Sequence, residues 1–230
     1  MIDLYTWSTP NGRKVSIMLE ECGLDYTVYP VDIRNREQHR PAFVQISPNS
    51  KIPAIIDREA GVSLMESGAI LLYLAEKTGK LLPPSGPARL RVIEWLMWQM
   101  GGLGPMLGQA HHFLHFNPGR AAYAEERYHG EAARLYRVLD GQLRDHEFVA
   151  GEYSIADVSI WPWISRFEWQ RIDLADFPNV RRWYETLAAR PAVQKGYDVP
   201  EKTNPVPMPG DRPGLSLVAE PESGPEIGAE

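Results

Sequence analysis

The fold follows from the stretch Ile2-Asp3-Leu4-Tyr5-Thr6-Trp7-Ser8-Thr9-Pro10-Asn11-Gly12, which joins a short apolar segment to a helical pattern. Residues 1–7 are predicted to form a strand and residues 12–22 a helix. Thr9 and Asn11 therefore lie at a strand-to-helix turn. The first N–H groups of a helix have no partner within the helix, so they stabilise an anion there. A thiolate, a phosphate and a carboxylate all suit this turn.

The alternation of strands and helices continues to residue 80, and the pattern predicts one α/β domain over residues 1–80. The order of elements is βαβαββα, which predicts a mixed sheet with helices packed on it and an antiparallel hairpin at its edge. The further elements are predicted at 27–31 (strand), 41–46 (helix), 52–56 (strand), 62–65 (strand) and 69–77 (helix).

A second, all-α domain is predicted over residues 88–198, after a linker at 81–87 that is rich in proline. Ser154-Ile155-Ala156-Asp157 has the form of a capping box at a helix start, and Pro191 suits a helix stop. Helical spacing extends over 88–116, 120–146, 155–170 and 177–189, with an interruption of the first stretch at Gly101–Pro105.

The last part of the chain, residues 199–230, is rich in proline and glycine. This composition predicts a tail without regular structure, because it offers little apolar surface to bury. A solvated tail is the simpler interpretation. The alternative is a tail that covers shallow grooves with its few apolar side chains, of which Val206 and Met208 are the first.

Composition excludes several classes of protein. The 230 residues carry a net charge of −6, which argues against non-specific binding to nucleic acid. No apolar run approaches the roughly 20 residues that cross a bilayer, and no secretory signal is visible, so no membrane partner is expected. The chain has one cysteine, Cys22, which fits a reducing, cytoplasmic compartment. Cys22 lies in the apolar stripe of the first helix and is predicted to be buried, not a nucleophile.

Two further motifs suit the binding of a peptide-like ligand. Pro53 suits either an ordinary trans bond at a strand start or a cis turn that leaves the Ile52 backbone free to pair with an extended peptide. Ser67 directly precedes a helical pattern, so its hydroxyl and the first free N–H groups suit a carboxylate. Glu66 beside it suits an ammonium group. A plain helix cap is the alternative for Glu66 and Ser67.

Three histidines, His111, His112 and His115, have helical spacing. Aromatic and aliphatic residues separate them, and no acidic or cysteine partner is near in sequence. We therefore predict no metal site and expect a helix end near a cleft.

Taken together, these motifs resemble those of the cytosolic glutathione transferases over residues 1–195. The stretches 98–106 and 111–113 are similar to the Nu-class enzymes and the fungal Ure2-like branch, which are glutathione-dependent disulfide-bond reductases with modest transferase and peroxidase activity. The other matching stretches are Thr9-Pro10-Asn11-Gly12, Ser47-Pro48-Asn49-Ser50-Lys51-Ile52-Pro53-Ala54, Glu66-Ser67-Gly68-Ala69-Ile70 and Ser154-Ile155-Ala156-Asp157.

This resemblance implies a thioredoxin-like first domain and a set of glutathione contacts. Thr9 and Asn11 would contact the sulfur, with Ser8 as a rival. The acceptor pocket would lie in the all-α domain, and Trp7 and Phe113 are candidates to line it. The remaining implied contacts are Gln38 and Lys51 with the glycyl end, Ile52 ahead of cis-Pro53 with the cysteinyl backbone, Glu66 and Ser67 with the γ-glutamyl end, and Arg127 with the tripeptide carboxylates.

The resemblance also implies a mechanism. A bound glutathione thiolate would attack a disulfide or electrophilic small molecule, with glutathione as co-substrate, no tightly bound cofactor and no catalytic cysteine of the protein. A homodimer is implied as well. The alternative function is a non-catalytic scaffold of the same family that binds ligands or a partner protein.

Overall fold

A computed structural model describes residues 1–210 of the chain. The predicted tail is therefore seen only in its first part. Residues 199–210 contain no helix or strand, and residues 211–230 lie outside the described residues. None of the helices between residues 1 and 210 combines the length and the apolar character that crossing a membrane would require.

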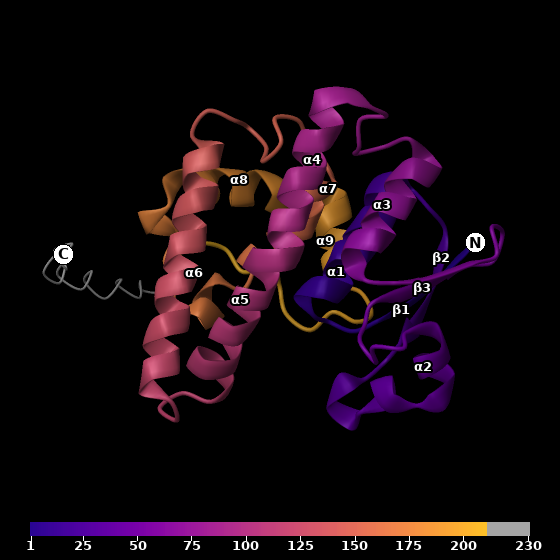
Figure 1. Ribbon diagram of the computed structural model, residues 1–230, viewed down its shortest axis with the longest axis horizontal. Helices are drawn as coiled ribbons and strands as arrows, with labels where there is room; N and C mark the ends of the chain where they lie inside the picture. Colours follow the sequence, from indigo (N-terminus) through magenta and orange to yellow (C-terminus); the bar gives the residue numbers. More distant parts are fainter. Residues whose placement is uncertain (211–230) are drawn as a thin grey trace, which may run out of the picture.

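A four-stranded sheet lies at one end of the molecule (Figure 1). The strand order is β2-β1-β3-β4, with β1 parallel to β2 and antiparallel to β3, and β3 antiparallel to β4. The central residue Leu4 pairs with Val28 on one side and with Ile55 on the other. The strands are β1 (Ile2–Thr6), β2 (Tyr26–Pro30), β3 (Ala54–Asp57) and β4 (Val62–Met65).

Helices cover both faces of this sheet, as the alternation of side chains in the strands requires. Leu4 and Ile55 face the main core with α1 and α3, whereas Tyr5 and Ala54 face a smaller cluster that contains Phe43 of α2. The helices are α1 (Pro10–Cys22), α2 (Pro41–Ile46) and α3 (Ser67–Thr78). The predicted βαβαββα order is confirmed.

The second unit is all-α, as predicted. Its first helical stretch is nearly continuous but passes through two π-helical segments, Gln99–Leu103 and His111–Phe116. The predicted interruption at Gly101–Pro105 is the first of these segments. The helices are α4 (Gly86–Trp98), α5 (Gly104–Ala110), α6 (Ala122–Leu143), α7 (Ile155–Ile164), α8 (Pro178–Ala188) and α9 (Pro191–Tyr197), with 3₁₀ turns at Ile33–Asn35, Glu37–His39, Phe167–Gln170 and Leu174–Asp176.

Two sequence-based boundaries need correction, and one helix was missed. The helix α4 begins at Gly86, inside the predicted linker 81–87. Pro87 is tolerated in the first turn because the N–H that proline lacks would have no partner within the helix there. α8 ends at Ala188, shortly before Pro191, as predicted, but Pro191 also starts α9, a helix that the sequence analysis did not predict. The helix predicted over 155–170 ends at Ile164 and is followed by a 3₁₀ turn.

The capping box at the start of α7 is present as predicted. The Asp157 carboxylate accepts hydrogen bonds from the Ser154 N–H at 3.0 Å and from the Val149 N–H and Trp183 Nε1, both at 2.9 Å. Burial nevertheless raises the pKa of Asp157 to about 6. This carboxylate ties α7 to α8 and to the loop that precedes it.

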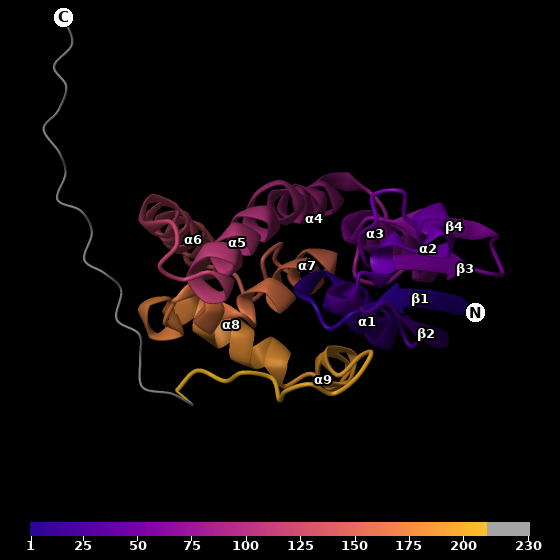
Figure 2. The same ribbon diagram turned by 90° about the horizontal axis from the view of Figure 1, so that it is seen from below.

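The first helix is the centre of the molecule. Both α7 and α9 of the second unit pack on α1, and Figure 2 shows α9 running alongside it. Arg13 is fully buried, stacks on the Tyr197 ring at 3.5 Å and donates from Nε to the Tyr197 carbonyl at 3.0 Å. The two units therefore share one core around α1.

Candidate active site

The predicted strand-to-helix turn is present between β1 and α1. Thr9 is the N-cap of α1, and its hydroxyl oxygen accepts a hydrogen bond from the Gly12 N–H at 3.1 Å. A Cβ at Gly12 would clash with the Trp7 carbonyl and the Thr6 hydroxyl, so only glycine fits there. The close approach fixes how the strand enters the helix.

Asn11 sits in the first turn of α1 and is held from the second unit. Its Oδ1 accepts a hydrogen bond of 3.0 Å from Nε1 of Trp163 in α7. The amide nitrogen has no hydrogen-bond partner among residues 1–210. Ser8, the rival sulfur contact, has its hydroxyl oxygen buried and without a partner among the same residues.

Glu66 and Ser67 lie beside this turn at the start of α3, but they do not cap the helix with their side chains. Glu66 occupies the N-cap position with φ 69° and ψ 112°, a conformation that is rare for a residue with a side chain. Ser67 is the first residue of α3, and no side-chain hydrogen bond caps the helix. The alternative of a plain helix cap is therefore wrong, and the first N–H groups of α3 remain open to a ligand.

A buried lysine, Lys14, contacts Ser67 from α1. Nζ of Lys14 lies 3.4 Å from Oγ of Ser67 and 2.7 Å from Oε1 of Gln99. Burial lowers the pKa of Lys14 well below its usual value, and the charge of Glu66 opposes that shift. Sequence analysis missed Lys14, although a lysine next to Val15 within a buried helix is a detectable signal.

The Ile52–Pro53 peptide bond is cis, the second of the two readings of the sequence. Neither the N–H nor the C=O of Ile52 takes part in a backbone hydrogen bond among residues 1–210. Lys51 is exposed, and its carbonyl accepts from the Ser47 hydroxyl at 2.8 Å. This loop presents unpaired backbone groups next to an exposed cation.

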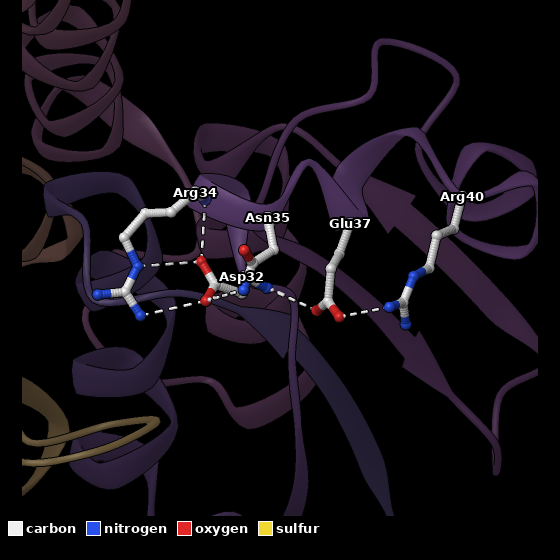
Figure 3. Close-up of polar contacts among 5 residues, drawn as sticks. All are labelled: Asp32, Arg34, Asn35, Glu37 and Arg40. Atoms are coloured by element: carbon white, nitrogen blue, oxygen red, sulfur yellow. Dashed lines mark hydrogen bonds and ion pairs between the residues drawn. The ribbon is translucent and has the colours of Figure 1, made fainter.

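Gln38 lies in the 3₁₀ turn Glu37–His39. A polar network that joins Asp32, Arg34, Asn35, Glu37 and Arg40 holds this segment in place (Figure 3). Asp32 accepts from the side chains of Arg34 and Asn35, at 3.1 Å each. The Asp32 N–H in turn donates to Glu37 at 2.8 Å, which also pairs with Arg40 at 2.6 Å. Arg34 also stacks over the Trp7 ring at 5.0 Å. Next to this network, Oε1 of Gln38 is buried and has no partner among the described residues.

The candidates from the second unit are more dispersed. Arg127 is exposed on α6, and both views show α6 on the side of the molecule away from the sheet (Figures 1 and 2). The Phe113 ring stacks on the ring of Tyr128 of α6 at 5.4 Å, and the Trp7 ring lies under the Arg34 guanidinium. The roles of Arg127, Trp7 and Phe113 stay predictions.

The histidines of the second π-helical segment are packed among aromatic rings. His111 stacks on Trp163 at 5.5 Å, and its Nε2 lies 3.0 Å from Nε2 of Gln170. Burial lowers the pKa of His111 to about 3. Within residues 1–210, no group of three His, Cys, Asp or Glu side chains converges in a way that suits a metal ion.

Comparison with known proteins identifies the family. Residues 1–76 match the family described as glutathione S-transferase, N-terminal domain, and residues 103–191 match its C-terminal domain. The disulfide-bond oxidoreductase YfcG of Escherichia coli K12 is 52% identical over 199 residues, which cover 84% of this chain and 93% of YfcG. The chain belongs to the glutathione S-transferase family. The resemblance inferred from the motifs is thereby confirmed.

Two solved structures of this family are closely similar to the chain. A glutathione transferase family member from Pseudomonas fluorescens Pf-5, with two glutathione bound, has a TM-score of 0.82 and 44% identity, covering 86% of this chain and 93% of its own. A glutathione transferase from Pseudomonas putida, with one glutathione disulfide bound per subunit, has a TM-score of 0.82 and 44% identity, covering 86% and 91%. The predicted glutathione transferase architecture is confirmed.

Proposed function

We propose that this member of the glutathione S-transferase family is a glutathione-dependent disulfide-bond reductase with modest transferase and peroxidase activity. The observation that carries the proposal is the free amide N–H₂ group of Asn11 at the N-terminus of α1, next to the Thr9 hydroxyl. The only cysteine, Cys22, is buried at the other end of α1 against Thr78. The reactive thiol therefore comes from glutathione.

The same proposal assigns the remaining contacts. The open start of α3 and the Ser67 hydroxyl hold the γ-glutamyl carboxylate, and Glu66 holds its ammonium group. The unpaired backbone of Ile52, ahead of Pro53, pairs with the cysteinyl residue. Gln38 and Lys51 hold the glycyl carboxylate, and the contact with Lys51 is strengthened by its positive charge. Arg127, exposed on α6, is assigned to the tripeptide carboxylates.

The reaction needs no group beyond two molecules of glutathione and the disulfide. The thiolate of the bound glutathione attacks one sulfur of the acceptor disulfide, forms a mixed disulfide and expels the other sulfur as a thiolate, which takes up a proton. A second glutathione thiolate attacks the mixed disulfide. The products are glutathione disulfide and two acceptor thiols, so atoms and electrons balance.

The protein's contribution is to favour the thiolate. A free thiol with a pKa of about 8.5 is only a few per cent ionised at neutral pH. Lowering this pKa by about two units requires ~2.7 kcal/mol of preferential binding of the thiolate. Hydrogen bonds from Asn11 and Thr9, together with the N-terminus of α1, are of the right size to supply it.

The test compares two variants in an assay of glutathione with hydroxyethyl disulfide. Asn11→Ala is expected to lose most of the activity, and Cys22→Ala is expected to keep it. Equal loss in both variants would contradict the proposal. An assay with chlorodinitrobenzene measures the transferase activity in parallel. If the wild type binds glutathione but is inactive in both assays, the protein is the non-catalytic scaffold.

We also propose that the protein works as a cytoplasmic homodimer without a tightly bound cofactor or a nucleic-acid or membrane partner. A reducing compartment supplies the glutathione that the reaction consumes. Leu90 and Met97 on α4 expose 67% and 48% of their surface, which suits burial against a second copy. Sedimentation velocity checks the dimer, and Leu90→Arg is expected to shift it to monomer.

A further inference from the structure

The orientation of the Asn11 side chain is fixed by chemistry. The indole N–H of Trp163 is a donor only, so the atom 3.0 Å away from it must be the amide oxygen. The amide nitrogen of Asn11 then points away from Trp163. Its two N–H donors have no partner among residues 1–210 and remain available to a ligand at the start of α1.

We propose that Trp163 is a positioning residue for the reduction of disulfides by bound glutathione. It holds the Asn11 amide so that the N–H₂ group, and not the carbonyl oxygen, faces the glutathione sulfur. An amide turned by half a rotation would present oxygen lone pairs to a thiolate, which repels it. The inference rests on the proposed function, because it assigns a partner to the sulfur-binding amide.

Contacts within the second unit hold Trp163 in this position. Its indole is packed against the ring of His111 at 5.5 Å with an interplanar angle of 23°, and 8% of the residue is exposed. Its carbonyl accepts from Nε2 of Gln170 at 2.9 Å. A Cβ at Gly108 would lie 3.4 Å from the indole, and one at Gly104 would lie 3.4 Å from Nε1. A methyl group at either position would therefore touch the ring at van der Waals distance.

This arrangement is more than core packing. Trp161, on the same helix, donates its N–H within the all-α domain, to the Tyr184 carbonyl at 3.1 Å. Trp163 instead donates across the two units to a polar side chain at the anion site. The all-α domain thus controls a donor on the thioredoxin-like domain.

The central experiment replaces Trp163 by phenylalanine, which keeps an aromatic ring and removes the N–H. The measurement is the pKa of bound glutathione, followed through the ultraviolet absorbance of the thiolate across a pH series. Loss of one orienting hydrogen bond is expected to raise this pKa by about one unit. Turnover of hydroxyethyl disulfide at neutral pH is expected to fall about tenfold, with the KM for glutathione little changed.

The matched control is Trp161→Phe, which makes the same chemical change on the same helix. It removes a hydrogen bond to the Tyr184 carbonyl and is expected to lower thermal stability without moving the pKa of bound glutathione. A shift of equal size in both variants would mean that the pKa responds to general loosening of α7. That result would overturn the proposal.

A double-mutant cycle separates a role through Asn11 from any other. If Trp163 acts through the amide, Trp163→Phe produces no further rise of the pKa in an Asn11→Ala background. An equal rise in both backgrounds, or none in the wild-type background, overturns the proposal. Failure of the proposed function looks different: the wild type itself then binds glutathione with an unshifted thiol pKa or turns over no disulfide.

A second measurement does not depend on the folding of Trp163→Phe. In protein labelled with ¹⁵N-tryptophan, Asn11→Ala is expected to shift the indole N–H signal of Trp163 and speed its hydrogen exchange. The signal of Trp161 serves as the internal reference and is expected to stay in place. An unchanged Trp163 signal would show that the hydrogen bond to Asn11 does not exist in solution.

Discussion

Nζ of Lys14 lies 2.7 Å from Oε1 of Gln99 in the interior of the protein, and Lys14 forms no ion pair within residues 1–210. Both side chains are buried, and burial lowers the pKa of the lysine well below its usual value. A cation in this position costs stability. Lys14 lies next to Ser67, where the proposed function places a carboxylate of glutathione.

Lys14→Met is therefore expected to separate stability from binding. Replacing a buried cation by an apolar side chain of similar length raises the melting temperature, since a group whose pKa is lowered in the folded state destabilises it at neutral pH. The affinity for glutathione falls about tenfold, because the carboxylate loses a nearby positive charge. Calorimetric titration with glutathione measures the affinity. Unchanged affinity would remove Lys14 from the site.

Glu66 combines a strained backbone with a carboxylate at the proposed site. Its φ of 69° suits glycine, so Glu66→Gly is expected to stabilise the fold by about 1 kcal/mol while weakening glutathione binding. Glu66→Ala removes the same carboxylate but keeps the strain. We expect both variants to lose affinity equally and only the glycine variant to gain stability. Denaturant unfolding and glutathione titration measure the two quantities.

The contact of α9 with α1 tolerates no side chain at Gly196. A Cβ there would lie 2.6 Å from the Cα and N atoms of Ile17, which are backbone and cannot move aside. Gly196→Ala is expected to cost about 1–3 kcal/mol or to detach α9. The control is Gly141→Ala on α6, where nothing lies within 4 Å. That change favours the helix by up to ~1 kcal/mol. Equal melting temperatures for the two variants would refute the close packing.

His111 makes the fold sensitive to acid. Its pKa of about 3 in the folded state lies below the usual 6.5, so its contribution to stability is complete above pH 6.5 and is lost as the pH falls toward 3. Burial is the main cause of the lowered pKa, and the charge of Arg166 adds to it. The neighbouring amide is arranged for the unprotonated ring. Oε1 of Gln170 accepts from the Tyr136 hydroxyl at 2.6 Å, so its Nε2 must donate to an unprotonated His111 nitrogen.

In His111→Gln, the free energy of unfolding is accordingly expected to fall less steeply on acidification, by up to ~1.4 kcal/mol per pH unit. Urea unfolding at pH 7 and pH 5 measures it. Asp157, whose pKa burial raises to about 6, titrates in the same range with the opposite sign, and it cancels in the difference between wild type and variant. The exposed His146, changed in the same way, is the control. Identical slopes for His111→Gln and wild type would contradict the expectation.

Local patterns sufficed for most of the fold. The strand-to-helix turn at Thr9 and the capping box at Ser154 both rest on neighbouring residues, and both are present in the structure. The failures are non-local. Pro191 follows the end of α8 as predicted, but the helix α9 that it starts was missed, because the packing of this short helix on α1 is not visible in the sequence.

The candidate site divides in the same way. Its polar turn was visible in the sequence because Thr9, Asn11 and Gly12 are consecutive or nearly so. Trp163 was not, since the residue lies in α7 and reaches Asn11 only through the tertiary fold. Its indole is one of several in an aromatic-rich domain, and no spacing along the chain distinguishes a tryptophan that fills the core from one that holds a side chain of the site.

The packing of α9 on α1 has a consequence for how the protein is made. The ribosome delivers residues 1–80 first, and a thioredoxin-like unit normally folds as soon as it emerges. Here one side of α1, with Arg13, Ser16 and Ile17, is covered by residues 196–197. The first domain therefore waits, with apolar and charged surface exposed, until almost the last helix has been synthesised. Nascent chains are expected to need chaperone protection throughout that interval.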